Sequence, residues 1–470
     1  EKERGISVTS SVLQFNYDGY CINILDTPGH QDFSEDTYRT LMAADSAVMV
    51  IDASKGVEAQ TIKLFKVCVM RHIPIFTFIN KMDRDARDTF ELLDDIETVL
   101  GIKTCPVNWP IGSGKEFKGV YDRKTKIVST FQAISTGGAK KAEETDYHID
   151  DEALKELVGP YLFDQLNEEI ELIDGATEEM DIEKVRAGEL SPVFFGSALN
   201  TFGIEQFLNY FLKMTTPPIG RNSSEGIIDP VTEPFSAFVF KIQANMNKAH
   251  RDRIAFMRIC SGKFEAGMEV YHAASKRKIK LSQPQQLMAQ DRKIVDEAYA
   301  GDVIGVFDPD LFSIGDTLTT GGKKFEYEGI PTFAPEHFCR VVQLNSMKRK
   351  QFVKGVTQIA QEGAIQIFQE YTAGLSEIIV GVVGVLQFDV LKYRLENEYG
   401  CEIRLEPIPY NYIRWVKDPT IDVTKLKRVS DVKKVKDMKG NPLLLFANEW
   451  VIDQVLQHNE GLELEEFRKN

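Results

Sequence analysis

The sequence predicts a multi-domain protein with an α/β domain, a β-barrel and a C-terminal α+β domain. Three observations lead to this prediction. The chain has 470 residues, whereas one domain typically takes ~100–200. In roughly the first two hundred residues, short apolar runs alternate with helical patterns, as in βαβ units around a largely parallel sheet. Strand-rich sequence with glycine turns follows, and strands then alternate with amphipathic helices.

The strands of the α/β region can be assigned one by one. The segment SVLQFNYDGYCINILD has the pattern of a hairpin with its turn at Asp18-Gly19, because alternating strands flank a turn dipeptide. Three further segments are rich in β-branched and aromatic residues and are predicted to be buried strands. These are Ser46 to Asp52, Ile73 to Asn80 and Pro192 to Ala198.

Helices and loops are expected between these strands. Apolar residues at helical spacing predict helices within Gly56 to His72 and Asp88 to Gly101. The polar stretch Ser135 to Asp146 is expected to be an exposed loop, followed by charged amphipathic helices. Proline, glycine and serine in Thr215 to Pro230 indicate a linker that ends the first domain.

Three domains are therefore expected, at residues 1–222, 231–330 and 335–470. The second domain is predicted to be a small barrel because it contains little helical pattern and several short strands. Those strands lie in FSAFVFKIQ, RIAFMRICSG, MEVYHA, DVIGVF and GDTLTT. A boundary falls near Pro331 to Pro335, and the order of elements after it is that of a compact α+β domain.

Composition narrows the class of protein. With 43% hydrophobic and 27% charged residues, the chain is typical of a soluble globular protein. No run approaches the ~18 apolar residues of a membrane span, and the first residues lack an apolar signal core. We therefore expect no membrane association and a cytoplasmic location. The six cysteines lie far apart without a C-x-x-C pair, which argues against a zinc site or a disulfide framework.

The charge distribution argues against nonspecific coating of nucleic acid. The formal net charge is −15, and neutralising phosphates requires clustered Lys and Arg. Local basic patches leave contact with RNA open. The densest are Ser275 to Lys280, Met347 to Lys350 and Lys425 to Lys439.

The strongest motif is DTPGH, which follows the apolar strand CINIL. Ligands of open α/β sheets bind at the carboxyl ends of strands, so Asp26 is placed to hold Mg²⁺ near a phosphate. Gly29 has no side chain, so its N–H can approach a γ-phosphate closely. His30 would position the attacking water. Thr27 and Pro28 complete this expected GTP-binding loop. The alternative is a strand-end turn without a ligand.

A second motif, NKMD, follows the strand IPIFTFI. A carboxylate at Asp83 can accept hydrogen bonds from both N1–H and the exocyclic amine of guanine, a donor pair that adenine lacks. Asn80 would bond the other edge of the base and tie loops together, and the stem of Lys81 would cover the base plane. Met82 completes the motif. This motif downstream of D-x-x-G is a strong signal for guanine nucleotides.

The third motif, FFGSAL, is weak alone. Ser197 and the backbone of Ala198 would brace the guanine-binding loop, and Leu199 follows them.

In this order the motifs resemble those of the translation-factor GTPases, the elongation factor G/Tu-like superfamily. Their first switch typically reads R-G-I-T, and RGIS from Arg4 to Ser7 occupies that place. The resemblance implies that Ser7 supplies a hydroxyl to Mg²⁺; serine keeps this oxygen and loses a methyl group. It also implies an α/β P-loop GTPase domain, a translation-factor barrel (domain II) and a ferredoxin-like C-terminal domain III.

Within that superfamily the chain is similar to the peptide chain release factor 3 family. The resemblance rests on DFSEDTYRTL, VFKIQANMNKAHRDRIAFMRICSGKFEAGMEV, GIPTFAPEHF and VGVLQFDVLKYRLENEYG. It implies a monomeric GTPase that uses GTP, GDP and Mg²⁺, binds the ribosome, and promotes departure of the codon-reading release factors.

One expected motif is missing. The phosphate-binding pattern G-x-x-x-x-G-K-[ST] is absent from the sequence. The resemblance therefore predicts a chain truncated before the first switch, which binds GTP poorly by itself. Two alternatives stay open at this point: another ribosome-binding translational GTPase, and a non-hydrolysing fragment that only docks on the ribosome.

Overall fold

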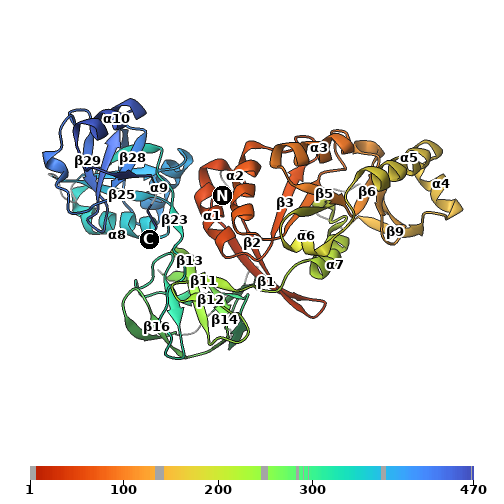
Figure 1. The fold of residues 1–470 in the computed structure, drawn as a ribbon, viewed down its shortest axis with the longest axis horizontal. Coiled ribbons are helices and arrows are strands. Elements are labelled where there is room, and N and C mark those ends of the chain that lie inside the picture. Colours follow the sequence, from red (N-terminus) through yellow and green to blue (C-terminus); the bar gives the residue numbers. More distant parts are fainter. Residues whose placement is uncertain are drawn as a thin grey trace. The chain divides into compact units, whose positions relative to one another are not determined.

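The structure, a computed structural model, describes residues 7–132, 142–244, 252–281, 285–288, 291–294, 296–371, 377–466 and 468–469. It divides into two compact units (Figure 1). One is Ala44–Pro217, and the other combines Glu1–Ala43 with Pro218–Asn470. The three-domain division stays a prediction.

The unit Ala44–Pro217 is built around a parallel sheet of order β3-β4-β10-β5. Its strands are β3 (Ala47–Asp52), β4 (Ile75–Asn80), β10 (Leu190–Phe195) and β5 (Lys103–Pro106). The central strands β4 and β10 are almost entirely buried, as their continuous apolar sequence requires when helices cover both faces. The helices are α2 (Ala59–Met70), α3 (Thr89–Leu100), α6 (Ile182–Arg186) and α7 (Ile204–Met214). Both predicted helices of this region and the three predicted strands are therefore confirmed.

One prediction about this sheet is wrong in part. The sequence predicts a buried strand at β3, yet Val48 is 44% and Val50 is 60% exposed. Val48 and Val50 share one face of β3, which the described residues leave uncovered, and β4 is the one partner of β3 among those residues. An edge strand with exposed β-branched residues is a template for pairing with other chains.

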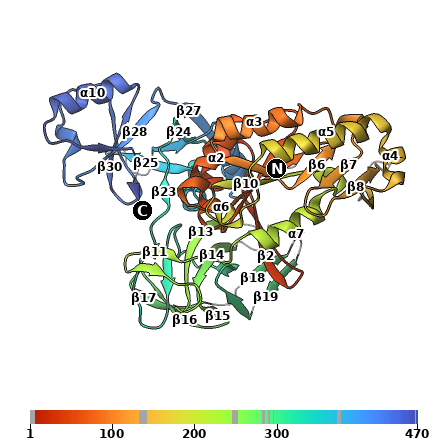
Figure 2. The ribbon, with the colours of Figure 1, turned by 45° about the vertical axis from the view of Figure 1, so that its right-hand side comes forward.

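A second, antiparallel sheet follows in the same unit (Figure 2). Its order is β6-β7-β8-β9, with β6 (Asn108–Ile111), β7 (Gly119–Asp122), β8 (Ile127–Gln132) and β9 (Glu143–His148). The helices α4 (Glu152–Val158) and α5 (Pro160–Ala176) follow it. Trp109 is fully buried, and its Nε1 donates to Oε2 of Glu169 over 2.6 Å, which fastens α5 to β6.

The expected loop Ser135 to Asp146 needs correction. Residues 135–141 lie outside the described residues, but Glu143 to Asp146 belong to β9, which pairs with β8 along its whole length. The ladder with β8 satisfies the backbone of this charged segment, so it forms an edge strand in spite of its polar sequence.

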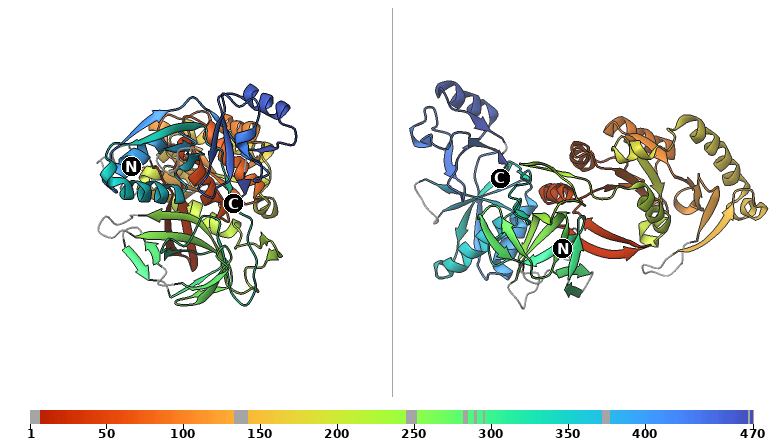
Figure 3. Two further views of the ribbon diagram at one scale, coloured as in Figure 1. Left: turned by 90° about the vertical axis from the view of Figure 1, so that its left-hand side faces the viewer. Right: turned by 60° about the horizontal axis from the view of Figure 1, so that its bottom comes forward.

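The other unit begins with the hairpin of β1 (Ser11–Tyr17) and β2 (Tyr20–Asp26). Its turn residues Asp18 and Gly19 have φ of 47° and 79°, the pair of positive values that a type I′ turn demands. The predicted hairpin and its turn are confirmed. A short 3₁₀ turn, Gln31–Phe33, and helix α1 (Ser34–Met42) follow. The red hairpin lies against green strands (Figure 3), where Gln14 and Asn23 both donate to Asp302.

The barrel-like domain of this unit is an eight-stranded antiparallel sheet of order β17-β16-β22-β13-β14-β21-β18-β19, with the pair β15-β20 beside it. All five predicted strands are present. The strands are β13 (Ser236–Ala244), β14 (Arg253–Ser261), β15 (Lys263–Glu265), β16 (Glu269–His272), β17 (Arg277–Lys280), β18 (Gln285–Met288), β19 (Asp291–Ile294), β20 (Glu297–Tyr299), β21 (Val303–Phe307) and β22 (Thr317–Thr319). Before them, the expected linker contains a small hairpin, β11 (Arg221–Ser223) and β12 (Gly226–Ile228).

The C-terminal domain starts with the order β24-α8-β25-β26-α9-β27 and the sheet order β27-β24-β26-β25, which confirms the predicted ferredoxin-like arrangement. The elements are β24 (His337–Gln343), α8 (Arg349–Gln361), β25 (Gln366–Glu370), β26 (Ile378–Val382), α9 (Leu386–Asn397) and β27 (Ile403–Pro407). The sheet then continues beyond β25 with elements that the sequence did not single out. These are β28 (Tyr412–Val416), β29 (Lys433–Lys436), β30 (Pro442–Phe446), α10 (Glu449–His458) and β31 (Leu464–Glu465), while β23 (Pro331–Thr332) pairs with β32 (Arg468–Lys469).

None of the described helices combines the length and the apolar character that crossing a bilayer requires. The six cysteines form no disulfide with one another.

The exposed edge at β3 leads to a first prediction. Val50→Lys should slow aggregation of this polypeptide on mild heating, because a charge on an exposed edge strand opposes strand pairing between copies. Leu172→Lys is the matched control, since Leu172 is 58% exposed on α5. Light scattering measures the rate. Equal slowing by both substitutions would show that added charge, and not the edge of β3, is responsible.

Candidate nucleotide site

The loop Asp26 to His30 leaves β2 with its polar groups toward solvent. Asp26 and Gly29 are exposed, and a Cβ added at Gly29 would meet nothing within 4 Å. Pro28 is buried, and its carbonyl oxygen accepts from Oγ1 of Thr37 over 3.2 Å. The loop is thus fastened to α1 at Pro28, and the carboxylate of Asp26 and the backbone of Gly29 stay accessible to a ligand.

The ring of His30 is held by the backbone N–H of Asp32. Its Nδ1 accepts from the N–H of Asp32 over 3.2 Å, and its side chain is 39% exposed. Because Nδ1 acts as an acceptor, a neutral ring carries its proton on Nε2. The imidazole therefore has one fixed nitrogen and one that remains for other partners.

The two predicted Mg²⁺ ligands fit that ion chemically. A hydroxyl at Ser7 and a carboxylate at Asp26 are oxygen donors, which Mg²⁺ prefers. Ser11 pairs with Asp26 across the hairpin, and Ser7 lies four residues before Ser11. Both side chains belong to exposed residues near the open end of the hairpin. Residues Arg4 to Ile6 of the first switch lie outside the described part of the chain.

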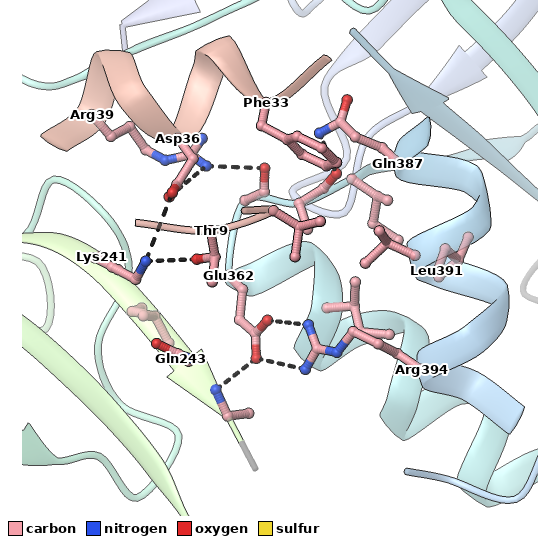
Figure 4. A pocket seen from close by; sticks show the side chains of 18 of the residues that line it. Thr9, Phe33, Asp36, Arg39, Lys241, Gln243, Glu362, Gln387, Leu391 and Arg394 are labelled. Atoms are coloured by element: carbon pink, nitrogen blue, oxygen red, sulfur yellow. Dashed lines mark hydrogen bonds and ion pairs between the residues drawn. The ribbon is translucent and has the colours of Figure 1, made fainter. Parts of the chain in front are cut away.

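Helix α1 is held by buried charges (Figure 4). Oδ2 of Asp36 accepts from both the N–H and the hydroxyl of Ser10, each over 2.5 Å, and lies 3.7 Å from Nζ of Lys241 on β13. Nζ of Lys241 donates to Oγ1 of Thr9 over 2.7 Å and to the carbonyl oxygen of Ser10. This cluster, Thr9, Ser10, Asp36 and Lys241, joins the start of the hairpin, α1 and the barrel.

The pKa values of the cluster follow from burial and pairing. Burial raises the pKa of Asp36, but Lys241, Arg39 and the Ser10 hydrogen bonds outweigh it, so the pKa is lowered. Burial lowers the pKa of Lys241 in spite of Asp36. Burial also raises the pKa of the neighbouring Glu35 carboxyl, which Arg39 offsets only in part. A buried ion pair of this kind depends on both partners being present.

The C-terminal end of α1 is held by the guanidinium groups of Arg221 on β11 and Arg258 on β14. Arg258 donates to the carbonyl oxygen of Ala43 over 2.5 Å, and Arg221 donates to that of Met42 over 2.8 Å. These carbonyls have no partner within the helix, and cations at a helix C-terminus are favourable.

The second half of the site lies in the unit Ala44–Pro217, at the carboxyl ends of β4 and β10. Oδ1 of Asn80 accepts from the N–H groups of Lys81 and Ala198, each over 2.8 Å. The N–H of the buried Met82 donates to the carbonyl oxygen of Gly196 over 3.2 Å. The structure therefore brings the NKMD and SAL segments together. Leu199, beside them, is 62% exposed.

Two residues that the sequence did not single out complete this arrangement. Nδ2 of Asn200 donates to Oδ2 of Asp83 over 3.1 Å and to Oγ of the buried Ser197 over 2.8 Å. Oδ2 of Asp52 accepts from Nζ of Lys81 over 2.7 Å. Burial raises the pKa of the Asp52 carboxyl, but Lys81 and Ser54 together lower it below its usual range. Asp52 could have been found from the sequence, because it is the polar residue that ends the predicted strand of β3. No sequence signal pointed to Asn200.

The loop Asp26 to His30 and the pair NKMD–SAL belong to different compact units. Among the described residues, no group of three His, Cys, Asp or Glu side chains forms a metal-binding cluster.

Comparison with known proteins covers nearly the whole chain. Residues 1–217 match the family described as elongation factor Tu GTP binding domain, residues 234–321 match elongation factor G domain 2, and residues 327–456 match class II release factor RF3, C-terminal domain. A peptide chain release factor 3 from Symbiobacterium thermophilum is 55% identical over 98% of this chain and 87% of its own length. The chain belongs to the peptide chain release factor 3 family. One from Gloeothece citriformis is 51% identical over 99% of this chain and 86% of its own length.

Family membership makes the protein a translational GTPase with the predicted multi-domain fold. A solved structure from Thermus thermophilus has a TM-score of 0.67 at 21% identity, and covers 89% of this chain and 64% of that one. At that identity the likeness shows the fold alone. The family implies guanine nucleotide binding and interaction with the ribosome.

The buried pair on α1 leads to the second prediction. Lys241→Met should lower the free energy of unfolding by about 3–5 kcal/mol, because it leaves Asp36 buried without its lysine. The double variant Asp36→Asn, Lys241→Met should lose less of the free energy of unfolding than Lys241→Met does, since no buried charge is left without a partner. Urea unfolding followed by circular dichroism gives both values.

Lys278→Met serves as the control for this cycle. Its side chain is 74% exposed and pairs with Glu269 over 3.5 Å, so its loss should cost less than about 1 kcal/mol. A double variant no more stable than Lys241→Met would contradict the pairing argument.

Proposed function

We propose that the protein is a GTP-dependent translation termination factor that binds the ribosome, hydrolyses GTP and promotes dissociation of codon-reading release factors. The observation that carries the proposal is the pairing of NKMD with SAL at the ends of β4 and β10, in a chain of this family that also carries DTPGH at the end of β2. One GTP-binding family spans both motif sets, at residues 1–217.

Base recognition is assigned to the loops after β4 and β10. The carboxylate of Asp83 accepts from the two adjacent donors of guanine, and Asn200 fixes that carboxylate from behind. Asn80 ties the loop to Ala198. Lys81 has φ of 69° and an ion pair to Asp52, and its stem would cover the base plane. Met82, Ser197 and Leu199 shape the surroundings of the base.

Phosphate recognition is assigned to the loop after β2. Asp26 and Ser7 would hold Mg²⁺, Asp26 through water, and this ion neutralises phosphate charge when it is bound. The exposed Gly29, at which an added Cβ would meet nothing within 4 Å, leaves its backbone open to a γ-phosphate, with Thr27 and Pro28 setting the course of the loop. His30 would orient the attacking water, so catalysis rests on positioning and charge stabilisation.

The ribosome is the proposed macromolecular partner, and codon-reading release factors are affected through it. We further propose a monomer that works in the cytoplasm. The matches of the barrel to elongation factor G domain 2 and of the C-terminal domain to class II release factor RF3 support the ribosome and the release factors as partners.

The base assignment is tested by Asp83→Asn in the native full-length protein. Xanthine has a carbonyl where guanine has its exocyclic amine, so an amide at position 83 should favour xanthine nucleotides. GDP affinity should fall about 100-fold or more, as expected when a buried donor pair loses its acceptor, and XDP affinity should rise. Fluorescent nucleotide titration measures both. Asp85→Asn, an exposed neighbour in the same loop, is the control and should leave both affinities unchanged. Equal loss of GDP and XDP binding would argue against base readout by Asp83.

The catalytic assignment is tested by His30→Ala on post-termination ribosomes carrying a labelled codon-reading release factor. GTP hydrolysis should slow by about 100-fold or more, while GDP binding stays as in the parent protein. The parent should speed departure of the labelled factor in a GTP-dependent manner. Hydrolysis without any effect on that factor would remove the termination role and leave a different translational GTPase.

A further inference from the structure

The N-terminus of α9 in the C-terminal domain is capped by a residue from the beginning of the chain. Val385, the N-cap of α9, makes no side-chain hydrogen bond to the helix. Instead, Oδ2 of Asp32 accepts from the N–H of Leu386 over 2.8 Å. A carboxylate at this position satisfies a donor that has no partner within the helix and interacts favourably with the helix dipole.

The approach of these two segments is close enough to require glycine. A Cβ added at Gly384 would lie 2.3 Å from both Cβ and Cγ of Asp32, so any larger residue must displace Asp32. The loop before α9 is held in place from its other side by Gln387. Its Oε1 accepts from the N–H groups of Val383 and Gly384, and its Nε2 donates to the carbonyl oxygen of Ala364.

The same residue holds His30. The N–H of Asp32 donates to Nδ1 of His30 over 3.2 Å, and Oδ1 of Asp32 lies 3.5 Å from that nitrogen. Asp32 is buried, with 7% of its surface exposed, whereas the His30 side chain is 39% exposed. One buried residue thus touches the helix of a distant domain with its carboxylate and the imidazole with its backbone.

Beyond this contact, residues of α1, β13, α8 and α9 line a cavity of about 290 Å³. Phe33, Arg39, Gln387 and Leu391 are among them (Figure 4). Two of the lining residues are in direct contact, since Arg39 donates to the carbonyl oxygen of Gly363 over 3.2 Å. Discrete polar contacts around a void can shift more readily than a close-packed interface.

We propose that Asp32 is a positioning residue that ties the orientation of His30 to the docking of α9. When α9 sits with Leu386 against Asp32, the N–H of Asp32 holds Nδ1 and presents Nε2 of His30 as the free nitrogen. When α9 moves, Asp32 is released and the ring loses its fixed orientation. The inference rests on the proposed function, since it gives the C-terminal domain control over the residue assigned to catalysis.

The test uses the native full-length protein with Asp32→Ala and Gly384→Ala. Both should lower kcat of ribosome-stimulated GTP hydrolysis about tenfold, because misplacing a catalytic group by about 1 Å costs that much or more. KM for ribosomes and GDP affinity should stay within about twofold, as expected for a change felt only in the transition state. Asp32→Asn keeps an acceptor oxygen for Leu386 and should recover most of kcat.

Asp151→Ala is the matched control. Asp151 caps α4 by accepting from the N–H of Ala153 over 3.0 Å, so its loss removes a helix cap of the same kind far from His30 in the sequence. It should leave kcat unchanged. The inference would be overturned if kcat fell equally in Asp151→Ala and Asp32→Ala. It would also be overturned if kcat stayed unchanged in both Asp32→Ala and Gly384→Ala.

A second readout does not depend on hydrolysis. The ¹⁵N shifts of the His30 ring should report the Nε2–H tautomer in the parent protein and a mixture of tautomers in Asp32→Ala. Suppose that His30→Ala loses hydrolysis but the ring shifts stay unchanged in Asp32→Ala. The role of Asp32 would then be overturned, while the catalytic assignment of His30 would stand. Unchanged hydrolysis in His30→Ala would overturn the catalytic assignment, and the ring shifts would then still decide whether Asp32 orients the ring.

Discussion

The ion pair between Asp36 and Lys241 is the constraint on which the arrangement around α1 depends. Both groups are buried, and together with Ser10 they join three segments that are far apart in the sequence. Moving two charges out of water is costly, and the cost is offset only when geometry and hydrogen bonding are nearly complete. The helix that follows the DTPGH loop therefore has one well-defined position against β13. The hydrogen bond from Thr37 to Pro28 fixes the loop to that helix.

The two candidate binding segments, which belong to different compact units, are built on different physical principles. The NKMD and SAL segments are joined by neutral and charge-assisted hydrogen bonds between adjacent strand ends, with Asn80 and Asn200 as the connecting residues. The DTPGH loop is short, and the helix to which it is fastened is held by buried charges outside the loop itself. The contacts of NKMD and SAL are consequently local, whereas the loop that carries His30 is bordered by contacts to β13 and to α9.

Sequence reasoning predicted the parts of the fold that have strong local signals. The Asp18-Gly19 turn, the apolar strands β4 and β10 and the α+β order of the C-terminal domain follow from patterns of period two and 3.6 and from turn chemistry, whereas its ferredoxin-like arrangement was implied by the family resemblance. Motif spacing likewise indicated NKMD and SAL as neighbours. Val50 was misjudged because its sequence context is that of a central strand, and being at the edge of a sheet depends on which other strands are present. Asn200 and Asp32 could not be found, since their roles depend on partners that only tertiary structure brings near: Ser197 and Asp83 for the first, and Leu386, 354 positions away, for the second.

The two arginines at the end of α1 leave this helix little freedom to tilt. Arg221 and Arg258 hold its last carbonyls, and Asp36 in its first turn is held by Ser10 and Lys241. The helix has 9 residues, so at 1.5 Å per residue the two anchors lie near the ends of a rod about 14 Å long. A tilt of only about 5° about one end would move the other end by roughly 1 Å, which is enough to disturb the buried hydrogen bonds of Asp36. The helix, and the loop fastened to it at Pro28, therefore follow the barrel strands as one rigid body.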